Sequence, residues 1–121
     1  MITLRNRVHL FTHPKNKEPL IDFFTTLLGC TVMVAPSSLP QPILAFSFVN
    51  GSSLSVEFTE EMVDALDEKQ ARRGAWLELE TDEPATLKEK ILAAGYHQFD
   101  YTEGFFYFQI PGGQVMRIQL P

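Results

Sequence analysis

The sequence has little cysteine, little positive charge and no long apolar run. Its single cysteine, Cys30, cannot form an internal disulfide, which agrees with a reducing compartment, and we expect a cytoplasmic protein. Cys30 follows a helix-ending glycine, and no His/Asp partner pattern lies nearby, so we expect a small buried hydrophobe rather than a nucleophile. No stretch approaches the roughly 20 apolar residues of a membrane helix, and Met1–Arg5 lacks a signal-peptide layout. We therefore expect neither a membrane protein nor an exported one.

Basic residues are outnumbered as well. Lys and Arg total 10 against 15 Asp and Glu, which gives a formal net charge of -5. Nucleic-acid binding depends on clustered cations that neutralise phosphates, and the basic residues here form only local pairs such as Arg72 with Arg73. We therefore expect no nucleic-acid partner.

The chain contains an internal repeat: a strand, an amphipathic helix and three more strands follow one another twice. With 121 residues and 45% hydrophobic content, it can bury one core. The pattern predicts an α+β fold of two βαβββ modules in a single domain over residues 1–121. Module one is expected at about 4–59, a bridge at about 60–74 and module two at about 75–121.

Helical spacing of apolar residues predicts helices over 19–29 and 84–95, each ended by a glycine. Asn50-Gly51 lies between two strand-like runs and predicts a tight hairpin there. The sixth strand is expected over 96–101. Together these signals give both modules the same sequence of elements.

Period-two alternation gives each strand one apolar face and one mixed face. The mixed faces carry His9, Phe11, Glu57, Trp76, Glu78 and Arg117. Such a face is either open to water or lines a cavity, and its two large aromatic side chains favour the cavity. Tyr107 on the seventh strand either lines this cavity or packs in the core.

The order and spacing of four segments resemble the vicinal oxygen chelate superfamily, the group of glyoxalase I, bleomycin-resistance proteins and extradiol dioxygenases. The segments are Arg7–Leu10, Ser53–Phe58, Gly74–Asp82 and Phe106–Ile118. The resemblance covers nearly the whole chain. It implies paired βαβββ modules with curved, mixed sheets that enclose a cavity, and it implies a homodimer.

The resemblance also implies four metal-ligand positions, on the first and last strands of each module. Carried onto this sequence, they fall on His9, Glu57, Trp76 and Arg117. The first two are proper ligands, but tryptophan has no ring lone pair for a metal, and arginine brings a fixed positive charge. Glu78 could substitute for one ligand. We expect no metal or other cofactor, and if a divalent metal ion is present, His9 and Glu57 are its ligands.

The leading functional hypothesis is a metal-free pocket that binds a small, partly apolar, anionic molecule. Its lining is predicted to be His9, Phe11, Glu57, Trp76, Glu78, Tyr107 and Arg117. Arg117 would either anchor an acidic group of the ligand or pair with Glu57. No catalytic residue is assigned.

Three alternatives stay open at this stage. One is a metal-dependent lyase, isomerase or dioxygenase of the glyoxalase type, in which a metal activates a bound oxygen. Another is a metal-free proton-transfer enzyme with Glu57 or His9 as base. The last is a pure interaction module whose pocket is filled.

Overall fold

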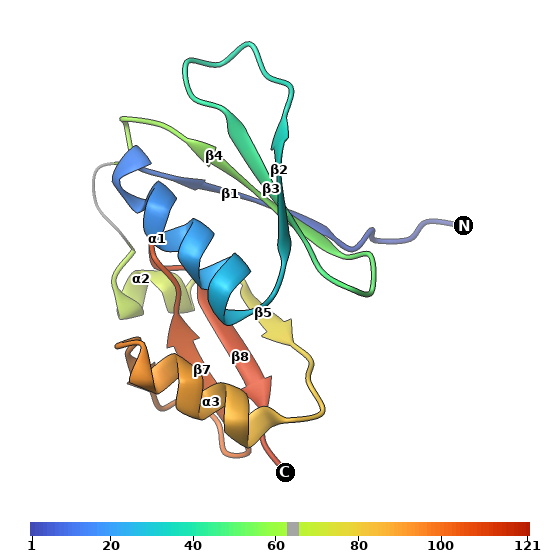
Figure 1. The fold of residues 1–121 in the computed structure, drawn as a ribbon. Helices are drawn as coiled ribbons and strands as arrows, with labels where there is room; N and C mark the ends of the chain where they lie inside the picture. The colour runs from blue at the N-terminus through green and yellow to red at the C-terminus, as the bar shows by residue number, and fades with distance from the viewer. Residues whose placement is uncertain (63–65) are drawn as a thin grey trace. The chain divides into compact units, whose positions relative to one another are not determined.

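The computed structural model describes residues 1–62 and 66–121, and it divides into two compact units, Met1–Asp64 and Ala65–Pro121. Each unit is described by itself (Figure 1). Unit 1 contains β1 (Arg7–Thr12), a 3-10 turn η1 (Pro14–Asn16), α1 (Lys17–Ile21), a π-helical turn η2 (Asp22–Leu27), β2 (Thr31–Ala35), β3 (Ile43–Ser47) and β4 (Ser53–Phe58). Unit 2 contains α2 (Glu68–Arg72), β5 (Trp76–Leu79), α3 (Pro84–Ala93), β6 (Gln98–Phe99), β7 (Phe105–Gln109) and β8 (Val115–Gln119).

The two sheets have the same topology. Unit 1 has the strand order β1-β4-β3-β2, and unit 2 has the order β5-β8-β7-β6. In each sheet the first and last strands of the module pair in parallel, and the other neighbours pair antiparallel. The predicted α+β fold with two βαβββ modules is confirmed, and neither sheet closes on itself. The single domain over 1–121 and the enclosed cavity stay predictions.

The helical segment of unit 1 buries its apolar stripe under the sheet. Phe24 is fully buried and stacks on Phe46 of β3, with ring centroids 4.5 Å apart. The segment begins at Lys17, earlier than predicted, and its second half is π-helical. The Thr25 hydroxyl donates to the Ile21 carbonyl at 2.6 Å, and a side-chain donor inserted in this way loosens the α-helical turn.

Unit 2 has a core on both faces of its sheet. On one face, α3 contributes the fully buried Ile91, and the Lys88 ammonium lies 5.5 Å from the centroid of the Phe106 ring on β7. On the other face, a buried cluster joins Ala71, Phe99, Tyr107 and Val115. Because α2 supplies the alanine of that cluster, part of the face predicted to be mixed is packed within unit 2.

The chain turns where glycine allows it. The predicted hairpin joins β3 to β4, and the Gly51 amide donates to the Phe48 carbonyl at 3.1 Å with a φ of 86° at Gly51. The sixth strand is shorter than expected and covers only Gln98–Phe99. Its start is delayed because the Tyr96 amide still bonds to the Ile91 carbonyl at the end of α3.

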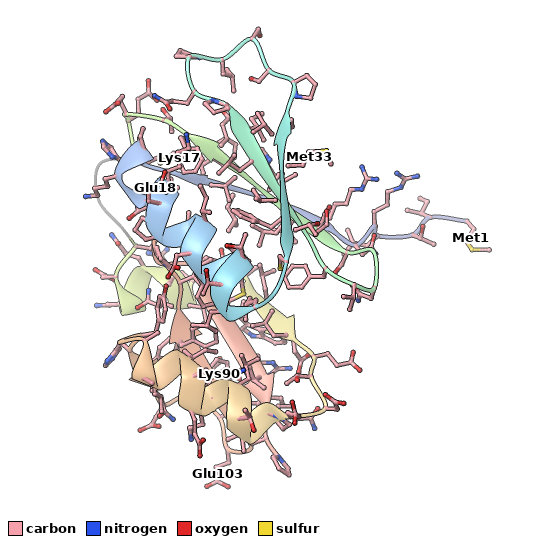
Figure 2. All side chains as sticks on the ribbon, in the orientation of Figure 1. Met1, Lys17, Glu18, Met33, Lys90 and Glu103 are labelled. Atoms are coloured by element: carbon pink, nitrogen blue, oxygen red, sulfur yellow. The ribbon has the colours of Figure 1, made fainter. Side chains whose placement is uncertain are left out.

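The outer strand β2 leaves apolar side chains uncovered within unit 1. Met33, labelled in Figure 2, is 64% exposed, and its neighbours Val32 and Val34 are exposed as well.

Over the described residues, no helix is both long enough and apolar enough to cross a bilayer.

Candidate functional site

The parallel strand pairs place the four carried-over positions in matching registers. In unit 1, Glu57 lies opposite Phe11, and His9 lies opposite Ser55. Glu57 and His9 are therefore diagonal neighbours on one face of the sheet, two residues apart in register.

Unit 2 repeats this register with other side chains. Arg117 lies opposite Glu78, and Trp76 lies opposite Val115. The pairing makes Arg117 the counterpart of Glu57, Trp76 the counterpart of His9 and Glu78 the counterpart of Phe11. The resemblance implied that His9, Glu57, Trp76 and Arg117 take corresponding places, and in the backbone register they do, while the match of Glu78 with Phe11 is new.

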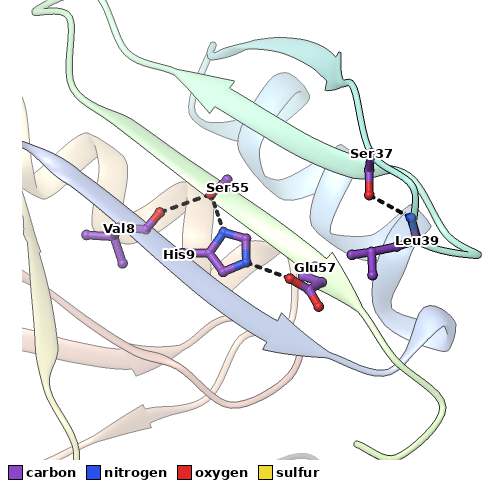
Figure 3. A network of polar contacts seen from close by, with 6 residues as sticks. All are labelled: Val8, His9, Ser37, Leu39, Ser55 and Glu57. Carbon is purple, nitrogen blue, oxygen red and sulfur yellow. Dashed lines mark hydrogen bonds and ion pairs between the residues drawn. The ribbon is translucent and has the colours of Figure 1, made fainter.

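His9 connects two polar side chains of β4 (Figure 3). Its Nδ1 lies 2.6 Å from Ser55 Oγ, and its Nε2 lies 3.1 Å from Glu57 Oε1. Ser55 Oγ also approaches the Val8 carbonyl at 3.5 Å. The network belongs to adjacent strands of one sheet, so its geometry is fixed by backbone pairing.

The network accommodates two protonation states of His9. A carboxylate only accepts hydrogen bonds, so Nε2 donates to Glu57 in both states. When the ring is neutral, the Ser55 hydroxyl donates to Nδ1. When the ring is cationic, Nδ1 donates to Ser55, whose hydroxyl turns to the Val8 carbonyl. Whichever way the Ser55 hydroxyl points, Nε2 keeps its contact with Glu57.

This face of unit 1 is open to solvent within the unit. The side chains of His9 and Glu57 are 38% and 25% exposed. The Phe11 ring packs edge-on against His9 with centroids 5.0 Å apart and is 55% exposed. A polar contact this exposed contributes little to stability, about 0–1 kcal/mol even when both groups are charged.

Arg117 has a different setting in unit 2. Its guanidinium carbon lies 3.5 Å from the centroid of the Trp76 ring and 3.9 Å from that of Phe105. The two rings come from β5 and β7, the strands on either side of β8. Two rings this close cannot share one face of a planar group, so they cover both faces of the guanidinium.

The edge of the guanidinium meets polar groups. Nη1 donates to the Tyr107 hydroxyl at 3.1 Å, and that hydroxyl lies 2.7 Å from Thr102 Oγ1. Because the tyrosine oxygen accepts from Arg117, its own proton is free to go to Thr102. Tyr107 is only 1% exposed and belongs to the buried cluster, so the core holds this hydroxyl in place.

The Nε of Arg117 is less well satisfied. Glu78 Oε1 lies 3.6 Å away, close enough for an ion pair but beyond hydrogen-bond length. Nε is buried and has no hydrogen-bond acceptor among the described residues. The Arg117 side chain is 16% exposed, whereas that of Glu78 is 40% exposed. The unpaired Nε therefore lies next to a partly exposed carboxylate side chain that does not bond to it. A buried donor in this state is a place where an oxyanion can bind.

The residues present do not fit the metal site that the family resemblance implies. At the two positions in unit 2, an indole and a guanidinium pack against each other and offer no lone pair to a cation. Within the described residues, neither unit brings three or more His, Cys, Asp or Glu side chains together as a metal site. His9 and Glu57 supply two donors, fewer than the three or four that protein metal sites use.

Sequence reasoning found the side chains on the mixed faces but missed three of their partners. Ser55 shares the parity of Glu57, so alternation along β4 could have placed it beside His9. Phe105 was not assigned to the site, yet it is half-buried and covers Arg117. Thr102 lies in the turn before β7, where no periodic signal applies. The predicted pairing of Arg117 with Glu57 joins residues of different units and stays a prediction.

Cys30 behaves as the sequence predicts. It is buried, and burial raises the pKa of its thiol from 9.0 to about 11. The thiolate is the nucleophilic form, so a raised pKa makes this cysteine unreactive at neutral pH.

No protein-family model and no curated protein sequence matches the chain. Solved structures do match it. A glyoxylase/bleomycin resistance protein/dioxygenase domain from Frankia sp. EAN1pec has a TM-score of 0.75 at 15% identity, covering 99% of this chain and 93% of that one. TnmS3, an antibiotic binding protein from Streptomyces sp. CB03234, has a TM-score of 0.66 at 16% identity, covering 99% and 97%.

A further match is the fosfomycin resistance protein FosX from Listeria monocytogenes, solved with Mn(II) and 1S,2S-dihydroxypropylphosphonic acid. Its TM-score is 0.67 at 15% identity, covering 98% of this chain and 90% of that one. At such identities the similarity is one of fold. The chain has the fold of the glyoxalase, bleomycin-resistance and dioxygenase proteins, so the predicted resemblance is confirmed at that level.

Proposed function

We propose that the protein binds a small, partly apolar molecule with an anionic group, without a metal, and that Arg117 holds the anionic group. The observation that carries this proposal is the buried Nε of Arg117, which has no hydrogen-bond acceptor among the described residues. Leaving a buried donor unpaired costs about 1–3 kcal/mol. An oxyanion on the ligand supplies the missing acceptor.

The surroundings of Arg117 account for the apolar part of the ligand. Trp76 is 41% exposed although one side of its ring covers the guanidinium, so open indole surface adjoins the donor. Small-molecule sites combine apolar and aromatic lining with a few polar groups. A neighbour of the same fold is described as an antibiotic binding protein, which supports small-molecule binding on this scaffold. The contributions of His9, Phe11 and Glu57 in unit 1, and assembly as a homodimer, stay predictions.

Trp76 is the only tryptophan of the chain, so its fluorescence reports directly on the surroundings of Arg117. We expect benzoate to change this fluorescence saturably, with a dissociation constant of about 1 mM, the range for a ligand of this size with one anchoring contact. Benzamide has the same shape and no charge, and it serves as the matched control. We expect it to bind at least about tenfold more weakly.

Arg117→Lys sharpens the test. Lysine keeps the positive charge but loses the planar fork and the stacking, so the benzoate dissociation constant should rise at least about tenfold. A chelator should leave it unchanged. Equal binding of benzoate and benzamide, or full binding by Arg117→Lys, would contradict the proposal.

The second candidate is a metal-dependent enzyme of the glyoxalase type. Two observations favour it: His9 Nε2 and Glu57 Oε1 lie 3.1 Å apart on adjacent strands, and one neighbour of the same fold was solved with Mn(II). Against it stands the incomplete ligand set. Metal analysis of the purified protein separates the two, because stoichiometric Zn, Ni, Mn or Fe retained after dialysis would favour the enzyme.

A further inference from the structure

The guanidinium of Arg117 can bind a ligand only through its edge, because the rings of Trp76 and Phe105 cover its two faces. Part of that edge is in use, since Nη1 donates to the Tyr107 hydroxyl. The side that remains is formed by Nε and Nη2. This side presents two parallel N–H groups, the geometry that a carboxylate or a phosphate accepts in a bidentate manner.

Glu78 stands at this side of the guanidinium without bonding it fully. Its Oε1 lies 3.6 Å from Nε, and Nε has no hydrogen bond to any described residue. Glu78 lies directly opposite Arg117 in the β5–β8 register, so the backbone holds the carboxylate next to the guanidinium. Its side chain is 40% exposed, which leaves its carboxylate able to turn into solvent at little cost.

From this geometry, and building on the proposed function, we infer that Glu78 is an internal competitor for the oxyanion site of Arg117. In the free protein its carboxylate neutralises the guanidinium from the side that a ligand would use. When an oxyanion binds, Glu78 moves away from Nε, and the ligand takes the hydrogen bonds that Glu78 does not complete. The competition weakens binding and sets a threshold: only an anion that makes both hydrogen bonds displaces Glu78.

Glu78→Gln tests this inference. Glutamine keeps the length and shape of the side chain but removes the negative charge, so it competes poorly for Nε and no longer repels an incoming carboxylate. With benzoate as the probe and Trp76 fluorescence as the readout, we expect Glu78→Gln to lower the dissociation constant about threefold to tenfold. Because the Glu78 side chain is 40% exposed and glutamine has nearly the same size, we expect the variant to fold normally, and far-UV circular dichroism verifies this.

Glu80→Gln is the matched control. Glu80 follows two residues later, is exposed and has no contact with Arg117 among the described interactions. Removing its charge changes the net charge equally, so it should shift the dissociation constant by less than about twofold. If Glu80→Gln tightens binding as much as Glu78→Gln, the effect is one of general charge and the inference is wrong.

The outcomes also separate the inference from the function beneath it. If the wild-type protein binds benzoate and Glu78→Gln binds it equally or more weakly, the competitor role is wrong while the anion site at Arg117 stands. If neither protein binds benzoate, the proposed function fails and the inference falls with it. If the wild-type protein binds benzoate, Glu78→Gln binds it more tightly and Glu80→Gln does not, the result supports both the competitor role of Glu78 and the proposed function.

Discussion

The two units share one topology and one register, yet they place opposite chemistry at matching positions. In unit 1 the last strand carries an acid, Glu57, which meets an imidazole across the parallel pair. In unit 2 the same position carries a cation, the guanidinium of Arg117, which contacts an indole and a carboxylate. A repeated backbone therefore sets which side chains become neighbours, and the side chains alone decide what the neighbourhood can bind.

The units also differ in how firmly they hold these groups. The His9 network lies on a face that is open within unit 1, whereas Arg117 rests on rings and on the buried hydroxyl of Tyr107. Groups held by a packed core keep their geometry without a ligand, and such preorganisation lowers the free-energy cost of binding. This difference adds to the unpaired Nε of Arg117 in favouring unit 2 for an anion site.

The largest expected effect uses one reporter in each unit: the only cysteine lies in unit 1, and the only tryptophan lies in unit 2. Burial raises the pKa of Cys30 from 9.0 to about 11. At pH 8 the folded protein then holds about 100-fold less thiolate than the unfolded chain. We expect iodoacetamide to label Cys30 at least about 100-fold more slowly in the folded protein than in urea.

The same reporters test whether residues 1–121 form a single cooperative domain. If they do, urea transitions followed by Cys30 labelling and by Trp76 fluorescence coincide. Separate midpoints would show that the units unfold independently.

The stability of the protein should also depend on pH through Cys30. Because the folded thiol has the higher pKa, its contribution to stability is present below pH 9.0 and is lost as the pH rises towards about 11.

A smaller effect is expected at the two matching hairpins. A Cβ on Gly113, in the turn before β8, would lie 2.5 Å from the Leu66 carbonyl oxygen, whereas one on Gly51 would meet nothing within 4 Å. Both glycines have positive φ values, 101° and 86°. Gly51→Ala should therefore lower the free energy of unfolding only by the cost of a positive φ at alanine, about 1–2 kcal/mol. Gly113→Ala should lower it by at least about 2 kcal/mol more, because its Cβ also meets Leu66. Urea denaturation measures both, and equal losses would show that the Leu66 contact is unimportant.

The smallest effect compares the two hydroxyl groups that touch the key side chains. Tyr107→Phe removes a buried hydroxyl that bonds both Arg117 and Thr102, so unfolding free energy should fall by about 1–3 kcal/mol. Ser55→Ala removes a half-buried hydroxyl on the open face of unit 1, and the expected loss is below about 1 kcal/mol. Chemical denaturation of both variants decides the order. A larger loss for Ser55→Ala would reverse the comparison.

The sequence predicted the fold well because alternation and glycine stops are local signals. The hairpin at Asn50-Gly51 and the order of both modules follow from such signals, and the structure confirms them. The short sixth strand and the π-helical turn were missed, since both depend on local backbone hydrogen bonds that no periodicity encodes.

The candidate site was predictable to the level of faces and registers but not of partners. Parity placed Trp76, Glu78 and Arg117 together, and they are together. Parity could not show that Arg117 lies between two rings, because stacking depends on side-chain rotamers across three strands. It also gave no sign that α2 would bring Ala71 onto the same face.

The segment after residue 65 has a practical meaning for dissecting the molecule. The Leu66 amide donates to the Gly112 carbonyl, the Leu66 carbonyl accepts from Gln109, and Ala71 completes a buried cluster with strand residues of unit 2. A fragment intended to carry the second half alone should therefore start at Leu66. A fragment that starts at the first residue of β5 would lack the hydrogen bonds of Leu66 and the core side chain of Ala71.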